Sequence, residues 1–410
     1  MRTSAGEIDS PARPALSRRA LLASLAVPAA SAKKTVAAIV TEYRLLSHAD
    51  VIVGRILDGY FPDNLRVEPR TRVVSMYTDQ IADTDMSRDL SAKHGFRIYP
   101  TVAEALTLGG SKLAVDAVLL IGEHGQYPTN EKGQKLYPRY ELFQRIVEVF
   151  RRSGRSVPLF SDKHLSYSWT KARMMYRQAL ELGIPFLAGS SIPLTVRTPE
   201  LDVPLGTRFE GAVAVGYGGL DSYGFHTLEA LQCLVERRAG GETGVAAVET
   251  LEGDAVWKWR DGPEGRWSAP LLEAALARAN RARPGSPERN SKNPAVFLLD
   301  YRDGLRAAVY MLGGHVENFL FAAKLAGRPE PVSTLFGLRE GRSLPHFDGL
   351  VRAIEEMFVT GRPPYPVERT LLTTGALAFA LESRHQRRHW STPELGVAYR
   401  PPRRRWFQRA

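Results

Sequence analysis

Residues 157–164, Val-Pro-Leu-Phe-Ser-Asp-Lys-His, are a short apolar run that ends in three polar side chains. A helical pattern over 166–182 follows, Gly183 ends it, and a second apolar run covers 184–188. This order predicts strand, charged turn, helix and strand, which is a βαβ unit. Ligands of open parallel sheets bind at the carboxyl ends of the strands. Lys163 is therefore expected where chemistry takes place, and a solvated polar turn is the alternative.

The chain before this unit alternates in the same way. Apolar runs predict strands at 36–40, 72–77 and 115–121, and helical patterns cover 47–58, 86–94 and 137–152. Such alternation is typical of an α/β fold. We predict a Rossmann-like domain over residues 33–190, with a doubly wound parallel sheet.

The pattern changes after residue 190. Strand-like runs recur near 210–215, 246–251, 296–301 and 305–312, and helical patterns cover 227–237, 271–279, 350–358 and 370–384. This mixture predicts a C-terminal α+β domain over 191–384 with a mainly antiparallel sheet. At 410 residues the chain is long enough for both domains. Residues 385–410 are predicted to be a basic tail.

The N-terminus has the pattern of a targeting segment. Arg18 and Arg19 precede an apolar stretch that ends in Ala30-Ser31-Ala32. This is typical of a twin-arginine export signal, so residues 1–32 are set aside from the fold. We expect export and a periplasmic location; the alternative is a disordered arm with two arginines.

The net charge of +11 is concentrated at the two ends of the chain. From Arg384 onward there are eight arginines and one acid, and residues 1–32 hold four arginines and two acids. The body is nearly neutral, so no nucleic-acid partner is expected, and the tail is expected to be solvated. No apolar run approaches the roughly 20 residues of a membrane span, so stable membrane insertion is not expected. The single cysteine, Cys233, excludes a disulfide framework and a cysteine zinc site, and no metal is assigned.

A second polar motif runs from Gly218 to Glu229. It combines glycines, Asp221, Tyr223, His226 and Glu229 at a predicted helix start. His226 and Glu229 are three residues apart and share one helix face. A carboxylate there can fix the tautomer of a histidine that acts as general acid or base. A capped helix start with a satisfied histidine is the alternative.

Together these motifs resemble the Gfo/Idh/MocA family of nicotinamide-dependent oxidoreductases. Asp162-Lys163-His164 is similar to the Glu-Lys-Pro that ends the family's fifth Rossmann strand, and Gly218-Gly219 with His226-x-x-Glu229 is similar to its His-x-x-Asp helix. Residues 93–106 and 364–383 also resemble family helices. The resemblance covers most of the chain after residue 32.

The resemblance implies NAD or NADP as cofactor and a sugar, polyol or related carbinol as substrate. Lys163 would bind the substrate hydroxyl on the nicotinamide side, and His226 would take or donate its proton. Glu229 would orient the histidine or bind substrate, while Asp221 and Tyr223 would line the pocket. The family's open sheet also implies a homo-oligomer.

Two departures concern the cofactor side. Residues 41–50 contain no glycine, whereas the family has a Gly-x-Gly-x-x-Gly turn that lets the diphosphate approach the backbone. A long polar loop, residues 122–133, follows the strand at 115–121. The candidate cofactor contacts are Thr41, Arg44, Asp79 (for the adenosine ribose), Glu123, Asp162 and Lys163.

These departures leave two alternatives to a redox enzyme. The first is a catalytically silent Rossmann-fold protein that keeps the fold for binding or assembly. The second is a non-redox lyase or hydrolase that uses Lys163 and His226 as its acid and base.

Overall fold

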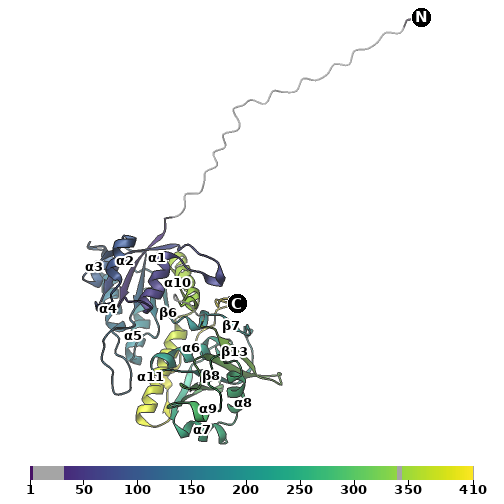
Figure 1. Ribbon diagram of the computed structural model, residues 1–410. Helices are drawn as coiled ribbons and strands as arrows, with labels where there is room; N and C mark the ends of the chain where they lie inside the picture. Colours follow the sequence, from purple (N-terminus) through teal and green to yellow (C-terminus); the bar gives the residue numbers. More distant parts are fainter. Residues whose placement is uncertain (3–31, 339–343, 410) are drawn as a thin grey trace. The chain divides into compact units, whose positions relative to one another are not determined.

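The computed structural model describes residues 1–2, 32–338 and 344–409. The predicted export segment falls on residues 1–32 and so lies, apart from its ends, outside the described residues. Lys34–Ala410 is one compact unit, which contains two β-sheets with helices packed against them (Figure 1).

The first sheet is parallel throughout and has the strand order β3-β2-β1-β4-β5-β6. Its strands are β1 Lys34–Val40, β2 Thr71–Thr78, β3 Arg97–Ile98, β4 Ala117–Ile121, β5 Leu159–Asp162 and β6 Phe186–Gly189. The order reverses between β1 and β4, which makes this edge of the sheet a topological switch point. The predicted doubly wound Rossmann-like sheet is confirmed.

Both faces of this sheet are covered, which explains its continuous apolar strands. Alternate residues of β1 point to opposite faces: Val36 and Ala38 belong to one apolar cluster, Ala37 and Ile39 to the other. The helices are α1 His48–Asp58, α2 Ser87–His94, α3 Val102–Thr107, α4 Arg139–Ser153, α5 Trp169–Glu181 and α10 Asp348–Thr360. Helix α10 packs with α1, although it lies within the range predicted for the second domain.

The second sheet is mixed and has eight strands in the order β14-β9-β10-β11-β8-β12-β13-β7. Its strands are β7 Arg197–Thr198, β8 Phe209–Gly216, β9 Val245–Glu252, β10 Ala295–Tyr301, β11 Arg306–Met311, β12 Phe319–Leu325, β13 Val332–Phe336 and β14 Trp390–Ser391. Only the β8–β11 pair is parallel. The predicted mainly antiparallel sheet is confirmed; β12 and β13 were not among the predicted strands.

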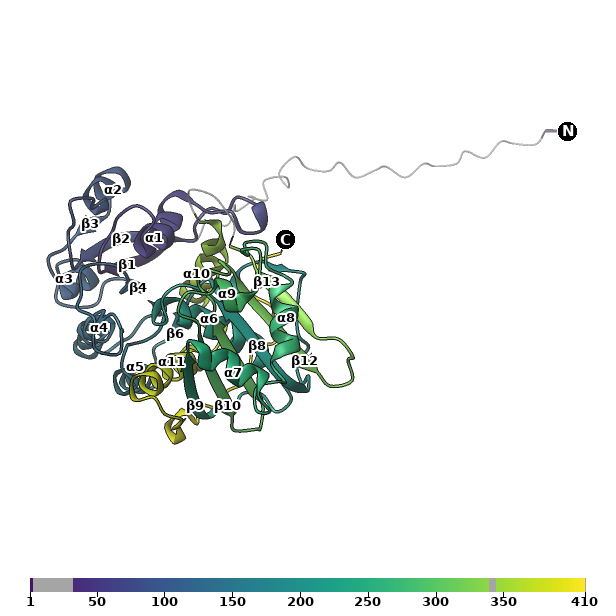
Figure 2. The ribbon, with the colours of Figure 1, turned by 60° about the horizontal axis from the view of Figure 1, so that its bottom comes forward.

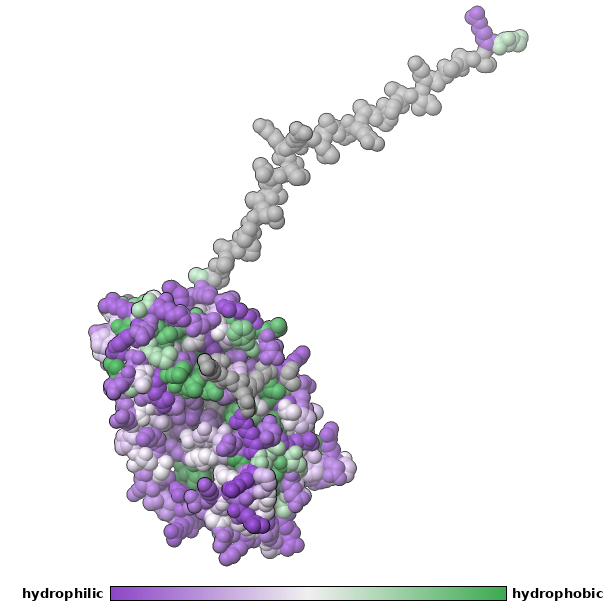
Figure 3. All heavy atoms as spheres, in the orientation of Figure 1, coloured by the Kyte–Doolittle hydropathy of each residue, from purple (hydrophilic) through white to green (hydrophobic). Residues whose placement is uncertain are grey.

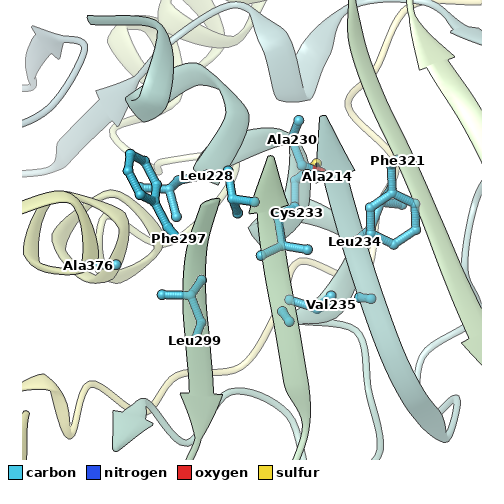
Figure 4. Packing of buried hydrophobic residues seen from close by; sticks show 14 of the residues in the cluster. Ala214, Leu228, Ala230, Cys233, Leu234, Val235, Phe297, Leu299, Phe321 and Ala376 are labelled. Carbon is cyan, nitrogen blue, oxygen red and sulfur yellow. Dashed lines mark hydrogen bonds between the residues drawn. The ribbon is translucent and has the colours of Figure 1, made fainter. Parts of the chain in front are cut away.

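This second sheet also has both faces covered by the chain's own helices. Ala212 and Ala214 of β8 pack with α6 and α11, whereas Val213 and Val215 pack with α7 and α8. Figure 4 shows the face of this sheet that α6 and α11 cover, where Phe297 of β10 lies near α11. The helices are α6 Ser222–Val235, α7 Asp254–Asp261, α8 Ala269–Leu276, α9 Pro287–Asn290 and α11 Glu368–Gln386. Helix α11 also contacts α5, so it joins the two sheets' layers (Figure 2).

The segment after α11 is not the solvated tail that its charge predicts. The side chain of Leu395 is buried in the core of the second sheet. Further on, the Gln408 amide donates to the Leu194 carbonyl at 2.9 Å, and Arg405 Nε lies 2.5 Å from Asp202 Oδ2. Apolar residues between the arginines give this segment something to bury, and the arginines pair with acids of the body.

The face shown in Figure 3 is mostly hydrophilic, with hydrophobic residues scattered among polar ones. Within the described ranges, no helix combines the length and the apolar character that crossing a membrane requires.

Candidate active site

A cleft of about 660 Å³ lies at the carboxyl ends of the parallel strands. Lys163 follows β5, Glu123 follows β4, and Tyr223 and His226 reach the cleft from α6. The lining also includes Leu46, His48, His124, Tyr137, Ser191, Ile192, Tyr217, Ser222, Arg281, Phe319, Leu338, Leu344, His346 and Phe347. We call this space the catalytic cleft. It brings together Lys163 and His226, which are far apart in the sequence.

Lys163 is held in a strained turn immediately after β5. Its backbone is left-handed, with a φ of 61°, a conformation that non-glycine residues adopt only when their surroundings impose it. Its amide donates to the Gly189 carbonyl at 3.0 Å, which ties the turn to β6. Its Nζ lies 2.9 Å from Glu123 Oε1. The lysine predicted to be functional is therefore fixed at both its backbone and its ammonium group.

Glu123 lies between two buried cations. Arg139, the first residue of α4, contacts the second oxygen of this carboxylate and also places Nη1 3.0 Å from His164 Nε2. Burial by itself would raise the pKa of Glu123, but Lys163 and Arg139 outweigh it and hold that pKa well below its usual value. Glu123, predicted as a cofactor contact, anchors Lys163 at the edge of the cleft.

His226 faces the cleft from the first turns of α6. Its ring packs edge-on against Tyr223 and Phe319, with centroids 5.9 and 5.7 Å apart. Its Nδ1 is buried and has no hydrogen-bond partner among the described residues. Burial first, and then the positive charge of Lys163, hold the pKa of His226 well below its usual value. The ring is therefore neutral near pH 7.

Glu229 lies one turn beyond His226, but no hydrogen bond within the described ranges joins the two. Glu229 Oε2 instead accepts from the Ser190 amide at 2.9 Å, at the end of β6. Burial raises the pKa of Glu229 to about 7. The predicted orienting contact is thus replaced by a contact to the first sheet, because the carboxylate points away from the cleft lining.

The two remaining predicted substrate contacts differ. Tyr223 lines the cleft and is partly exposed. Asp221 is not among the residues that line it; its Oδ2 accepts from the Lys135 amide at 2.9 Å. Burial raises the pKa of Asp221.

The most informative contact that the sequence did not reveal is between His48 and Asp162. His48 begins α1 and Asp162 ends β5, and His48 Nδ1 lies 2.6 Å from Asp162 Oδ2. They are 114 residues apart in the chain. Asp162 was predicted as a cofactor contact, and here it holds a histidine of the cleft. No motif or spacing in the sequence indicates this pair.

The region around Thr41, Asp79 and Tyr127, which we call the nucleotide end, is closed by contacts within the chain. Asp79 follows β2, and its carboxylate accepts hydrogen bonds from the hydroxyls of Tyr77 and Tyr127, each at 2.7 Å. Tyr127 belongs to the polar loop after β4. The acid predicted to bind the adenosine ribose is therefore already bonded to two tyrosines.

Further contacts join the turn after β1 to the loop after β4. Thr41 Oγ1 donates to the Glu123 carbonyl at 2.8 Å, and Arg44 Nη2 lies 3.3 Å from His124 Nδ1. The side chain of Gln80, next to Asp79, accepts from the Gln126 amide at 2.7 Å and donates to its carbonyl at 3.0 Å. Thr41 and Arg44 thus contact the loop, across the switch point.

Side-chain oxygens of the chain itself accept hydrogen bonds from backbone amides at the start of α1. Ser47 accepts from the Asp50 amide at 3.3 Å, and Asp50 Oδ2 accepts from the Leu46 amide at 2.9 Å. In this fold the diphosphate binds backbone amides at that helix start. Here side-chain oxygens of the chain occupy two of these amides and Asp50 adds negative charge, so the residues do not fit a diphosphate in the usual place.

Across residues 32–338 and 344–409, no three histidine, cysteine, aspartate or glutamate side chains are grouped so as to hold a metal ion.

No protein-family model and no curated protein sequence matches the chain. Solved structures do. GenD2 from gentamicin A biosynthesis, in complex with NAD, is 13% identical over 88% of this chain and 96% of its own, with a TM-score of 0.56. Myo-inositol 2-dehydrogenase from Lactobacillus plantarum is 10% identical over 88% and 99%, with a TM-score of 0.53. Apo scyllo-inositol dehydrogenase from Lactobacillus casei is 8% identical over 88% and 98%, with a TM-score of 0.51. The fold expected from the Gfo/Idh/MocA resemblance is therefore the fold of this chain, which it shares with these three proteins.

Proposed function

We propose that the chain is an oxidoreductase that acts on a hydroxyl-bearing carbon of a sugar, polyol or related carbinol, with NAD or NADP as hydride carrier. The observation that carries the proposal is the meeting of Lys163 and His226 in one cleft, at the carboxyl ends of the parallel strands. The fold adds support, because solved structures that share it include inositol dehydrogenases and a protein crystallised with NAD.

The residues of the cleft suit the proton half of such a reaction. The Lys163 ammonium, fixed by Glu123 at 2.9 Å, would donate a hydrogen bond to the substrate oxygen and stabilise the charge that develops there. A neutral imidazole in the cleft would take the hydroxyl proton. The nicotinamide, when bound, would accept or supply the hydride.

No step is assigned to a residue of the nucleotide end, since the start of α1 does not fit a diphosphate. This mismatch favours a second candidate, a lyase or another non-redox enzyme that uses the same lysine and imidazole for proton transfer. Both candidates place the reacting carbon beside Lys163. They differ in whether the protein binds a dinucleotide.

One experiment separates the two candidates. The natively purified protein is examined for bound nicotinamide by absorbance and mass spectrometry, titrated with NADH and NADPH, and assayed with NAD+ or NADP+ against a panel of polyols and aldoses. We expect binding and turnover that Lys163→Met and His226→Gln each reduce at least 100-fold. Lys112→Met, at an exposed position, is the control. Failure to bind either dinucleotide would reject the redox proposal and leave the non-redox candidate.

We also propose that the chain is exported by the twin-arginine route to the periplasm. The support is the Arg18-Arg19 pair with its apolar stretch and small residues at Ala30-Ser31-Ala32. Replacing both arginines by lysine should leave the protein in the cytoplasmic fraction. A periplasmic signal that survives this replacement would reject the route.

A homo-oligomer also stays a proposal. Because α6 and α11 cover one face of the eight-stranded sheet and α7 and α8 cover the other, such an assembly would use another surface than an open sheet face. Sedimentation of the purified protein measures the state directly.

A further inference from the structure

We propose that His48 is the proton acceptor of the catalytic cleft and that Asp162 is its positioning residue. This inference rests on the proposed function. It adds to that function by naming the imidazole that takes the substrate proton. The pair joins α1 to β5 at the point where the fold ordinarily places a glycine-rich turn and a diphosphate.

The contact has the geometry of an oriented base. His48 Nδ1 lies 2.6 Å from Asp162 Oδ2, and the Asp162 side chain is fully buried whereas 13% of the His48 side chain is exposed. A carboxylate accepts, so Nδ1 carries the hydrogen of this bond. With its hydrogen at Nδ1, the neutral form of the ring has an unprotonated Nε2. A buried acid that holds an imidazole in one tautomer is the arrangement that activates bases in many enzymes.

The ring is fixed in place, and it borders the catalytic cleft. It packs edge-on against Phe347, with centroids 5.2 Å apart, and lies 5.3 Å from the ring of His124. Its Nε2 has no hydrogen-bond partner among the described residues, and the side chain is one of those that line the cleft. The free nitrogen is therefore available to a ligand there.

The surroundings explain why this imidazole, rather than His226, takes the proton. Asp162 gives His48 a negative partner, so the imidazolium that forms on proton uptake has a counter-charge. No carboxylate of the described residues is hydrogen-bonded to His226, and burial and the charge of Lys163 oppose its protonation. Within the described part of the chain, the other titratable groups that line the cleft around His48 are Glu123, His124, Tyr137, Lys163, Tyr217, Tyr223, Arg281 and His346.

The step itself is simple. The substrate O–H bond breaks, the electron pair stays on an oxygen that Lys163 stabilises, and a new N–H bond forms at His48 Nε2. Asp162 precedes Lys163 directly in the chain, so one turn after β5 holds both the positioning acid and the cation. His226 is left to accept a hydrogen bond from the substrate.

A first test needs neither substrate nor cofactor. The nitrogen shifts of the wild-type protein, labelled with ¹⁵N-histidine, should show His48 protonated at Nδ1 and bare at Nε2, with the signal assigned by its loss in His48→Gln. Diethyl pyrocarbonate, which acylates unprotonated imidazole, should modify His48, and Asp162→Asn should slow this at least fivefold. Exposed His389 is the internal reference. An Nε2–H tautomer, or a His48 that stays unmodified while His389 reacts, would overturn the proposal.

A second test uses turnover with the polyol and cofactor pair found above. His48→Gln should lower kcat at least 100-fold with KM changed less than threefold, and Asp162→Glu should recover part of the activity that Asp162→Asn loses. His94→Gln, on α2, is the matched control. If turnover exists and His48→Gln leaves kcat unchanged, the assignment of the base is wrong while the oxidoreductase stands. If no dinucleotide binds, the first test still decides the dyad.

Discussion

The catalytic cleft and the nucleotide end lie along the same edge of the six-stranded sheet but are held by different forces. In the cleft, Glu123 is shared by Lys163 and Arg139, and all three side chains are almost fully buried. At the nucleotide end, Asp79 and Tyr127 form a bond between partly buried groups. One end depends on buried charge, and the other on exchangeable hydrogen bonds.

This difference in burial and charge indicates which of the two ends keeps its contacts permanently. Burying three charges costs several kcal/mol of desolvation for each ion, which the attraction between them repays only with good geometry. A fold gains little stability from such a cluster, so the role proposed above for Lys163 accounts for it better. A bond between a tyrosine and a carboxylate is worth on the order of 1 kcal/mol and can be exchanged for a ligand.

The largest effect is therefore expected in the cleft. Glu123→Gln leaves Lys163 and Arg139 without their shared counter-charge, and breaking a buried pair in this way costs about 3–5 kcal/mol. The free energy of unfolding from urea titration measures it. Glu141→Gln, which removes the partner of the more exposed Lys171, should cost less than about 1 kcal/mol. Equal losses of unfolding free energy in the two variants would mean that the buried cluster of Glu123, Lys163 and Arg139 contributes no more than a surface ion pair.

The next largest effect is a pH dependence of the free energy of unfolding, which Glu229 causes. Its pKa is raised to about 7 in the folded protein by burial, so between pH 4.5 and 7 the folded state binds the proton more tightly than the unfolded state. Stability from this group is fully present below pH 4.5 and is lost as the pH rises to 7, on the order of 3 kcal/mol in all.

Glu229→Gln should remove this slope, because an amide does not titrate. Unfolding curves of both proteins at pH 4.5, 5.5, 6.5 and 7.5 make the comparison, and the difference between them should follow a single titration. Parallel curves for the two proteins across this range would show that Glu229 does not carry the dependence.

Much of this arrangement follows from local sequence. The run ending at Asp162-Lys163 is apolar enough to be a buried strand, and the polar residues after it had to lie at the carboxyl edge, so the place of Lys163 was predictable. The position of His226 at a helix start was predictable as well, and its three-residue spacing from Glu229 puts both on one helix face. Their shared face did not make them partners, since Glu229 found a backbone amide of the first sheet instead.

What local sequence could not show are the contacts between distant segments. His48 and Asp162 are paired only because α1 starts beside the end of β5, and Arg139 reaches Glu123 only because the long loop after β4 folds back over the sheet edge. The same holds for Tyr127, whose hydroxyl meets Asp79. Each contact depends on the path of a loop, which periodicity does not encode.

A backbone substitution tests how tightly the cleft side is built. Gly189 has a φ of 123°, and a Cβ there would lie 2.5 Å from Glu229 Oε1 and 3.1 Å from Thr370 Oγ1. Gly189→Ala should cost about 2 kcal/mol from backbone strain and displaced neighbours. Gly206→Ala is the matched control, since its φ is also positive but nothing lies within 4 Å of its Cβ; it should cost about 1 kcal/mol. A Gly189 variant no less stable than the Gly206 variant would show that the packing between Gly189, Glu229 and Thr370 can accommodate a Cβ.

The smallest effect on stability is expected at the nucleotide end, where it carries the most information about function. Tyr127→Phe removes one hydroxyl that donates to Asp79 at 2.7 Å, which should cost about 1 kcal/mol or less. The released carboxylate can then accept from a ribose hydroxyl, so NADH should bind several-fold more tightly than to the wild type, as measured by its fluorescence. Tyr140→Phe, on α4, is the control, and it should leave binding unchanged. If Tyr127→Phe loses stability as Glu123→Gln does and binds no more NADH, the nucleotide end is a permanent part of the fold, and the non-redox candidate becomes the better account of the cleft.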